Sequence, residues 1–351
     1  MRPLLLILSL FSITVLKAQK LDVISPEEAG LNRDSVNYLI GAIQETSHKD
    51  FRGLVVIKDD KIVIEEYFNT FWRNTILDIR SAGKSITALL LGVAIQEGLI
   101  HDLDQDVYSL FSKSKNRSVN EDYKKIKLRH LLDMSSGLDA DTNDPQTPGQ
   151  AGNWMGKDDW KEYLLNIPVN SKPGKRWVYA DINALLIGLA IEEASGMSLR
   201  DYAQQKLFAP LEIEQVYWYT NAANQTGAAG NLYLTTLDFA KLGLLVVNGG
   251  KWNGTQLMNS DYTKELVEHK NFDLSKEFSL ADSYGLLWYK STRTFAGKKT
   301  DYLFASGNGG NQLIVIPDKK MVIALTASAY GQRYAHGRSN TIMTMILNAL
   351  E

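Results

Sequence analysis

The stretch DIRSAGKSIT, residues 78–87, decides between two folds because its lysine fits two different motifs. As Gly83-Lys84-Ser85 it matches the end of a phosphate-binding loop, which would indicate a nucleotide-using protein. As Ser81-x-x-Lys84 it places a serine nucleophile one helical turn before a lysine, which would indicate a serine hydrolase.

The phosphate-loop interpretation fails on residue chemistry. Such a loop needs a first glycine five residues before Gly83, because the backbone there must curl its N–H groups around a phosphate. The residue at that position is Asp78, and the four residues between hold no glycine. A carboxylate at that point would repel the ligand.

The serine interpretation agrees with helix geometry. Residues three apart on a helix share one face, so the side chains of Ser81 and Lys84 can meet. The apolar run that follows, with Gly98 as a stop, predicts a long helix that begins near Ser81. Free N–H groups at a helix start favour a developing negative charge, and a desolvated lysine can help to activate the hydroxyl. A helix-capping serine beside an exposed lysine is the alternative.

Two further segments weigh against that alternative. In GKRWVYADINALLIGLAIEEASG, residues 174–196, Tyr179 and Asp181 precede a long apolar helix. In FASGNGGNQLIVIP, residues 304–317, Ser306-Gly307 stand where a strand ends. A tyrosine can become an anion beside a lysine ammonium, and a glycine-rich strand end can present a backbone N–H to a carbonyl oxygen.

Apolar, β-branched runs near both ends of the chain predict strands, and the stretch between them is mostly helical in pattern. We expect an α/β (α+β) fold, in which antiparallel strands from both ends form one sheet covered by helices and the middle is inserted as an all-helical domain. The expected division is a sheet domain of residues 19–100 plus 290–351 and a helical domain of residues 101–289.

Together, these three elements in this order resemble the serine β-lactamase and penicillin-binding-protein superfamily, nearest its class C and esterase-like branch. The resemblance covers nearly the whole mature chain. Other stretches that carry it are LRHLLDMSSGL (128–138), FAPLEI (208–213) and YGLLWY (284–289).

The resemblance implies roles for particular residues. Ser81 would be the acylated nucleophile, with Lys84 as its helix neighbour and Tyr179 as general base. The backbone N–H groups of Ser81 and Asn308 would form the oxyanion hole. The residues expected to contact substrate are Asp181, Ser306, Gly307 and Trp288, the last as part of an acyl pocket. No metal or cofactor is required.

Two positions depart from the family pattern. Asp181 stands where β-lactamases usually carry asparagine, and beside Lys84 it would keep the lysine charged and leave Tyr179 as the base. Ala305 stands where β-lactamases and D,D-peptidases carry a cation that holds the substrate carboxylate. Arg333 or Arg338 could restore that charge. Without it, a carboxyl ester or a small amide is favoured.

Composition narrows the partners. The 38 Lys and Arg nearly balance the 40 Asp and Glu, so the net charge of −2 gives no basic surface for nucleic acid. With no cysteine, disulfides, thiolate nucleophiles and Cys-ligated zinc are excluded. The five histidines show no paired metal spacing. A small ester, amide or peptide-like substrate remains, and nothing in the sequence specifies an oligomeric state.

The N-terminus resembles a secretory signal. Arg2 precedes an apolar run from Leu4 to Leu16, which is too short for a bilayer span, and Ala18 fits a cleavage site. We expect residues 1–18 to be removed and the protein to be secreted or periplasmic, with no stable membrane anchor.

The sequence therefore predicts a serine hydrolase that forms an acyl-enzyme on carboxyl ester or small amide substrates. A β-lactamase or D-Ala-D-Ala carboxypeptidase is the alternative within enzymes. A non-catalytic binding module on the same fold is the alternative from another class.

Overall fold

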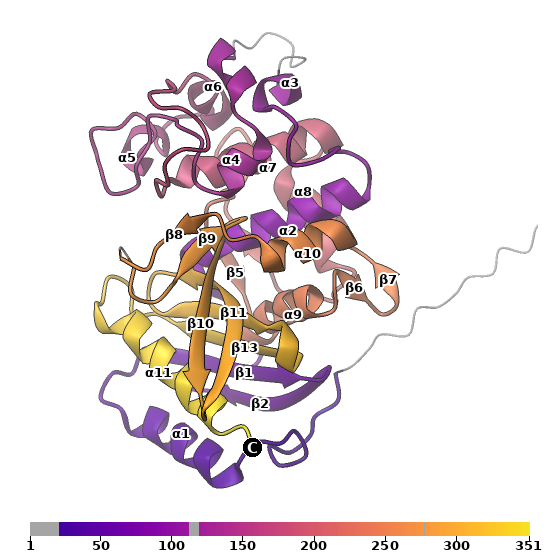
Figure 1. Ribbon diagram of the computed structural model, residues 1–351, viewed down its shortest axis with the longest axis vertical. Coiled ribbons are helices and arrows are strands. Elements are labelled where there is room, and N and C mark those ends of the chain that lie inside the picture. The colour runs from indigo at the N-terminus through magenta and orange to yellow at the C-terminus, as the bar shows by residue number, and fades with distance from the viewer. Residues whose placement is uncertain (1–20, 112–118, 277) are drawn as a thin grey trace, which may run out of the picture.

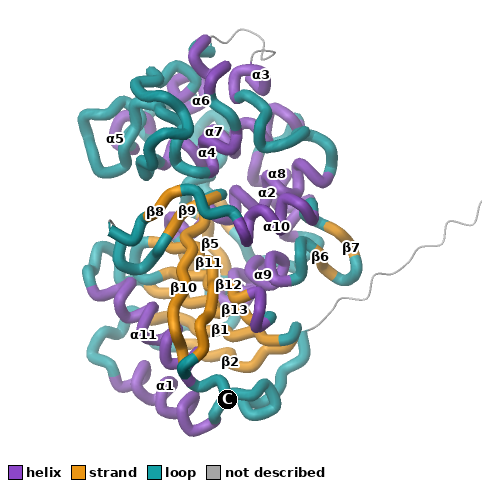
Figure 2. Tube along the Cα trace, in the orientation of Figure 1, coloured by secondary structure: helices purple, strands orange, loops and turns teal. Residues whose placement is uncertain are grey.

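The computed structural model describes residues 21–111, 119–276 and 278–351 (Figures 1 and 2). The predicted signal peptide, residues 1–18, lies outside the described residues. The described chain has a sheet with helices on both of its faces, and a region built mainly from helices beyond one end of that sheet (Figure 1).

The main sheet has eight strands in the order β2-β1-β13-β12-β11-β10-β9-β8, and all neighbours are antiparallel. This arrangement confirms the predicted antiparallel sheet, to which both ends of the chain contribute. The strands are β1 (Phe51–Lys58), β2 (Lys61–Tyr67), β8 (Phe272–Asp273), β9 (Ser283–Gly285), β10 (Trp288–Phe295), β11 (Lys298–Gly307), β12 (Asn311–Ile316) and β13 (Met321–Ala327).

Local sequence explains the turns and the strand composition. The β1–β2 hairpin turns at Asp59 and Asp60, whose φ angles of 50° and 60° are those of a hairpin turn that aspartate tolerates. Every residue of β12 and β13 is buried. Their continuous apolar runs reflect a sheet that is covered on both faces, because a half-exposed strand would alternate.

Helices close both faces of the sheet (Figure 1). On one face, α1 (Arg33–Glu45) and α11 (Tyr334–Asn348) pack with the sheet around a core that includes Leu39, Ile323 and Ile346. On the other face, α9 (Thr236–Val247) contacts β13, β12 and β1. The central strands are therefore shielded from water on both sides.

The helical region centres on α7 (Asp181–Ser195), which contacts α2 (Gly83–Gln96), α3, α4, α6 and α8. From Ile182 to Ile191 every residue of α7 is buried, because helices surround it. The other helices of the region are α3 (Val107–Phe111), α4 (Leu128–Leu132), α5 (Ala151–Trp154), α6 (Trp160–Leu164) and α8 (Leu199–Ala203). The division at residues 101 and 289 stays a prediction; α9 lies between these limits and packs on the sheet.

A small sheet of three strands includes the strand that precedes the segment containing Ser81 and Lys84. Its strands are ordered β3-β5-β4, with β3 at Leu77–Asp78, β5 at Leu232–Leu234 and β4 at Tyr217–Trp218. A short 3₁₀ turn at Arg80–Ala82 follows β3 and runs directly into α2 (Gly83–Gln96). The predicted stop at Gly98 is confirmed, since its φ of 71° is the left-handed value that ends a helix.

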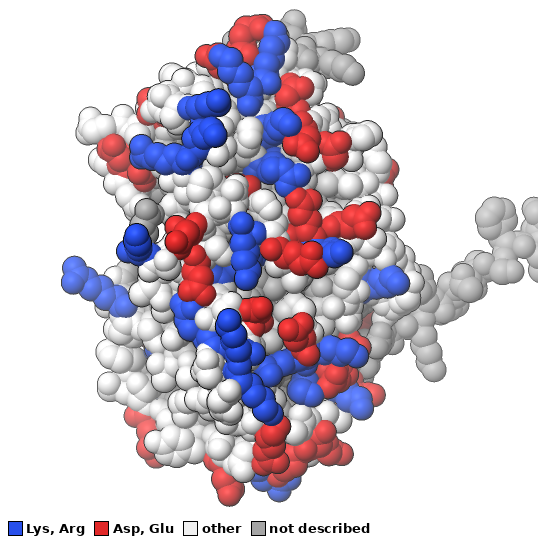
Figure 3. Space-filling view, viewed as in Figure 1, with Lys and Arg blue, Asp and Glu red and all other residues white. Residues whose placement is uncertain are grey.

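The remaining strands and α-helix are β6 (Lys251–Trp252), β7 (Thr255–Gln256) and α10 (Ser260–Glu268), and short non-α helical turns lie at Glu121–Lys125, Gln204–Phe208 and Pro317–Lys319. Of the helices in the described ranges, none is by itself long and apolar enough to cross a membrane, although α7 and the segment Leu199–Phe208, bent by 76°, pass that test together. Positive and negative side chains are intermixed on the face shown in Figure 3, as the balanced composition leads one to expect.

Candidate active site

Ser81 and Lys84 meet at the start of α2, as the three-residue spacing predicts. The ammonium Nζ of Lys84 lies 3.0 Å from Ser81 Oγ. The residue that caps α2 is Ala82, so Ser81 is not a capping serine, and Lys84 is 2% exposed. The alternative of a capping serine beside an exposed lysine is therefore excluded. Ser81 itself is partly exposed, which leaves its hydroxyl accessible.

Lys84 Nζ has two hydrogen-bond acceptors and one anionic partner. Besides Ser81 Oγ, its Nζ lies 2.8 Å from the backbone oxygen of Ala229 and 2.8 Å from Asp181 Oδ1. Burial favours the neutral lysine, but Asp181 and then Tyr179 outweigh it, and the pKa of Lys84 is raised. Lys84 is thus held in its charged form, as predicted from Asp181.

Tyr179 and Asp181 reach Lys84 from the segment that begins α7. The Tyr179 ring centroid lies 5.0 Å from Lys84 Nζ. Thr142 holds this segment at two points: its backbone N–H donates to the Tyr179 carbonyl at 2.9 Å, and its Oγ1 accepts from the Asp181 N–H at 3.2 Å. Asp181 is also favoured in the first turn of a helix, where the dipole is positive.

The end of β11 lies against the nucleophile turn. A Cβ on Gly307 would come within 2.0 Å of the Ile79 carbonyl oxygen and 3.3 Å of the Ala82 nitrogen. The next residue, Asn308, is fixed by two hydrogen bonds: its carbonyl accepts from Asn311 Nδ2 at 2.9 Å and its Oδ1 from the Gly331 N–H at 2.8 Å. The backbone at the end of β11 and the backbone of the turn before α2 therefore lie directly beside each other.

The structure places the other predicted site residues, Ser306, Ala305 and Trp288, away from the hydrogen bonds of Lys84. Ser306 is close to the start of α11, with its Oγ 3.5 Å from His336 Nδ1, and burial lowers the pKa of that histidine. Ala305 is fully buried. Trp288 is also fully buried at 0% exposure, so its ring packs inside the core and does not line an acyl pocket open to solvent.

Sequence reasoning missed the contribution of the loop at residues 227–231. This loop supplies the Ala229 oxygen to Lys84, and its Gly230 packs against the nucleophile turn, where an added Cβ would lie 3.1 Å from the Arg80 oxygen. The glycines of this loop were a visible signal, because glycine permits such a close approach of two backbones. Thr142 carried no signal of this kind.

A family model for Beta-lactamase matches residues 41–340. The chain belongs to the Beta-lactamase family. This result confirms the resemblance drawn from the three motifs.

Individual relatives of this Beta-lactamase-family chain are distant. An Escherichia coli O157:H7 protein named "Putative D-alanyl-D-alanine carboxypeptidase" is 27% identical over 226 residues, which cover 58% of this chain. The match spans about half of that relative, 51% of its length.

Solved structures share the fold. "Putative 6-aminohexanoate-dimer hydrolase from Bacillus anthracis" has a TM-score of 0.72 at 19% identity, over 94% of this chain and 88% of the other. A D-stereospecific amidohydrolase from Streptomyces sp. has a TM-score of 0.67 at 16% identity, over 90% and 98%.

Replacing Asp181 by asparagine in this Beta-lactamase-family chain should move the alkaline limb of the pH–rate profile. The Asp181 carboxylate raises the pKa of Lys84 against burial. Without it, Lys84 loses its proton at lower pH, so a reaction that needs the ammonium should fail at lower pH. We expect the apparent pKa of the alkaline limb, measured from kcat/KM for p-nitrophenyl butyrate, to fall by about one pH unit or more.

Asp261→Asn is the matched control, because Asp261 also lies in the first turn of a helix but is exposed on α10. Its profile should coincide with that of the wild type. If neutral Lys84 were the base, Asp181→Asn would instead raise the rate near pH 7, and that result would exclude the charged-lysine arrangement.

Gly307→Ala should separate the strand end from the nucleophile turn, because the backbone oxygen of Ile79 occupies the position of the new methyl group. We expect kcat/KM to fall about a hundredfold and the free energy of unfolding to fall by about 2 kcal/mol. Gly337→Ala, in α11 with no atom within 4 Å of its Cβ, should leave kcat/KM unchanged and raise the free energy of unfolding by up to about 1 kcal/mol, because alanine favours a helix more than glycine does. Equal activities in the two variants would contradict this packing argument.

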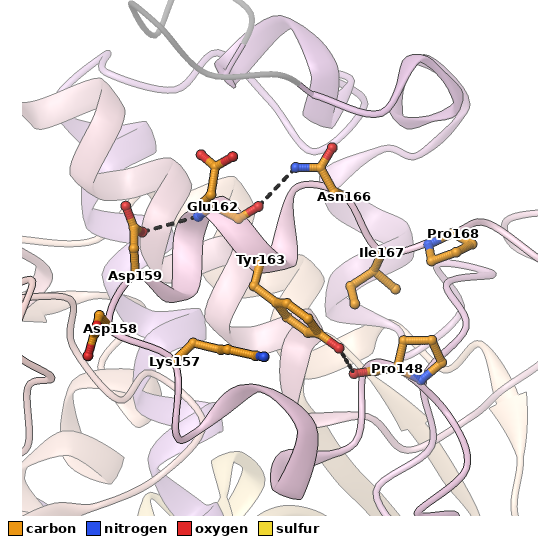
Figure 4. Close-up of a pocket in the computed structure, with 9 residues that line it drawn as sticks. All are labelled: Pro148, Lys157, Asp158, Asp159, Glu162, Tyr163, Asn166, Ile167 and Pro168. Carbon is orange, nitrogen blue, oxygen red and sulfur yellow. Dashed lines mark hydrogen bonds between the residues drawn. The ribbon is translucent and has the colours of Figure 1, made fainter.

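A separate hollow of about 490 Å³ lies in the helical region (Figure 4). It is lined by residues of α6 and its flanking loops, among them Tyr163, whose hydroxyl donates to the Pro148 oxygen at 3.0 Å. It contains none of Ser81, Lys84 and Tyr179. Within the described ranges, no group of three or more His, Cys, Asp or Glu side chains could hold a metal ion.

Proposed function

We propose that this chain is a serine hydrolase that acts through an acyl-enzyme on Ser81, with carboxyl esters or small amides as substrates. The arrangement of Lys84 is the observation that carries the proposal, since its ammonium donates to the Ser81 hydroxyl and to the Ala229 carbonyl and forms an ion pair with Asp181. Such a lysine cannot take the serine proton, so a separate base is required.

Tyr179 is the proposed base. Its phenolate takes the proton from Ser81 Oγ as that oxygen bonds to the substrate carbonyl carbon, and the nearby Lys84 ammonium stabilises the phenolate. The proton then passes to the leaving oxygen or nitrogen as the scissile bond breaks. Water then attacks the acyl carbon while Tyr179 takes its proton, the bond to Ser81 Oγ breaks, and Tyr179 returns the proton to that oxygen, which releases the acid and free Ser81.

The N–H groups of Ser81 and Asn308 are proposed to hold the oxyanion. The close contact between Gly307 and the nucleophile turn supports this pairing, because it brings the two backbones together. Each donor of such a hole typically stabilises the transition state by about 3 kcal/mol.

The buried, uncharged Ala305 favours esters and small amides over β-lactams and D-Ala-D-Ala peptides. The name of the E. coli relative supports a D-Ala-D-Ala carboxypeptidase as the second candidate. We also propose export to the periplasm or beyond, on the strength of the N-terminal sequence.

Covalent labelling tests the proposal. The protein is incubated separately with a fluorophosphonate and with a labelled penicillin, and intact mass and peptide mapping locate the adduct. A fluorophosphonate adduct on Ser81 together with p-nitrophenyl ester turnover supports the hydrolase. A penicillin adduct without ester turnover moves the assignment to β-lactam or peptidoglycan chemistry, and no adduct from either probe supports a binding module.

A further inference from the structure

The substrate-binding cation of the family is missing at Ala305, and the two arginines considered as replacements do not supply an obvious one. Arg338 is paired with Asp50, which also accepts from Tyr334. Arg333 is exposed just before α11. A third arginine, Arg80, directly precedes the nucleophile.

Arg80 has an unusual backbone. Its φ of 54° lies in the left-handed region, which costs a side chain other than glycine on the order of 1 kcal/mol. Glycine would adopt this conformation without strain. The chain instead has an arginine one residue before Ser81, so the strained position presents a cation beside the nucleophile.

The guanidinium of Arg80 is held by an aromatic ring. Its Cζ lies 4.3 Å from the centroid of Tyr330. Tyr330 in turn fills the space beside Gly309, where a Cβ added to the glycine would lie 2.7 Å from the Tyr330 ring. The Tyr330 hydroxyl donates to the backbone carbonyl oxygen of Asp78 at 3.1 Å. Tyr330 therefore links the Arg80 cation to the turn that follows β11, which also contains the proposed oxyanion donor Asn308.

Arg80 also has an anionic neighbour. Its Nε lies 3.2 Å from Asp78 Oδ2, but the contact lacks hydrogen-bond geometry, and Nε and Oδ2 have no hydrogen-bond partner among the described residues. Burial raises the pKa of Asp78, while the hydrogen bond from the Arg80 N–H and the charge of Arg80 act in the opposite direction. The Arg80 side chain stays 40% exposed, so the guanidinium remains open to a ligand from solvent.

Aromatic rings lie near Arg80 and its partner Asp78. Tyr233 lies opposite Asp78 in the small sheet, and the ring of Tyr217 packs against Tyr233 at 5.4 Å. Cross-strand neighbours point to the same face of a sheet, so these rings flank the side on which Asp78 meets Arg80. An aliphatic substrate chain that ends in a charge fits this aromatic surface better than a polar substrate chain does.

We propose that Arg80 binds a carboxylate of the substrate, so that the preferred substrates are esters or amides with a carboxylate a few carbons from the scissile carbonyl. This inference rests on the proposed function of Ser81. Neighbouring Cα atoms are about 3.8 Å apart and an arginine side chain reaches several ångströms further, so the carboxylate should lie within roughly 10 Å of the serine. A guanidinium binds a carboxylate through two parallel hydrogen bonds, which gives the site its selectivity.

The test compares two esters that differ in one charge: the mono-p-nitrophenyl ester of glutaric acid and p-nitrophenyl valerate. The measured quantity is the ratio of their kcat/KM values, because damage to the fold lowers both rates together. In Arg80→Met, which keeps the apolar stem, we expect the ratio to fall at least about tenfold. Arg80→Lys should retain part of the preference, since it keeps the charge but loses the fork.

Arg73→Met is the matched control, because the Nε of Arg73 also pairs with a carboxylate, that of Glu65 at 3.3 Å, on the edge strand β2. Its ratio should equal that of the wild type, and added salt should lower the wild-type ratio. An unchanged ratio in both Arg80 variants would overturn the proposal while leaving the hydrolase intact. Turnover of neither ester by the wild type would instead show that the proposed function itself has failed.

Discussion

Ser81→Ala should lower kcat/KM for p-nitrophenyl esters by on the order of 10⁴-fold or more, because it removes the atom that forms the acyl-enzyme. The fluorophosphonate adduct should disappear as well. The fold should persist, since the structure gives Ser81 Oγ one hydrogen bond, from Lys84, and its loss costs about 1 kcal/mol. Steady-state kinetics, intact mass and a thermal melt measure the three effects.

Ser85→Ala is the control for this experiment. Ser85 lies one turn further along α2, is buried, and donates from Oγ to the Leu287 oxygen at 2.7 Å. This variant should lose some stability but keep the adduct and the turnover. If Ser81→Ala retained more than a tenth of the wild-type kcat/KM, another residue would have to be the nucleophile.

The contacts that the sequence predicts best are local ones. Ser81 and Lys84 meet because residues three apart on any helix share a face, so the motif alone is sufficient. The hairpin at Asp59 and Asp60 is predictable for the same reason, since turn chemistry is set by adjacent residues. The pairing of Asp181 with Lys84 is only a hypothesis from the family resemblance, because no local rule joins residues 97 positions apart.

Contacts between distant backbones were not predictable. The Ala229 oxygen that binds Lys84 belongs to a peptide bond, and every residue has one, so no side chain marks it. Gly307 and Gly230 were visible as glycines, but the atoms they approach, on Ile79 and Arg80, depend on packing across the fold. The sequence does not predict that Trp288 is buried in the core, because its position near a motif does not say which face of its strand is buried.

Asp133 shows how a motif residue serves the fold. This fully buried carboxylate accepts from His269 Nε2 at 2.9 Å, Asn271 Nδ2 at 2.7 Å and the Leu286 N–H at 3.1 Å. It thereby joins the end of α4 to the connection between β9 and β10. Lys290, on β10, lies beside this network and donates to the His269 oxygen.

Lys290→Met should stabilise the protein at neutral pH. Lys290 is 2% exposed, and burial lowers its pKa from 10.5 to about 7, although Asp133 opposes the shift. That difference corresponds to roughly 5 kcal/mol of cost for the charged form. After the lost hydrogen bond to His269 is subtracted, we expect the free energy of unfolding at pH 6 to 7 to rise by about 2 kcal/mol.

The advantage of Lys290→Met should depend on pH with a defined sign. Between pH 7 and 10.5 the unfolded chain binds a proton on Lys290 that the folded chain does not, so wild-type stability from this group rises with pH. The advantage of the variant should therefore be largest at pH 7 and below and shrink by up to about 1.4 kcal/mol per pH unit above it. Lys84 does not interfere, because its pKa is raised from 10.5, so its contribution to stability is constant below pH 10.5 and changes only above it.

Urea unfolding between pH 6 and 9.5 measures the effect of Lys290→Met, with Lys299→Met as control. Lys299 lies on the neighbouring strand β11 and is exposed, so its replacement removes a lysine without removing a buried charge. The control should match the wild type across the range. An advantage that stayed constant with pH, or a loss of stability at pH 6, would show that the buried lysine is not a source of instability and that its bond to His269 dominates.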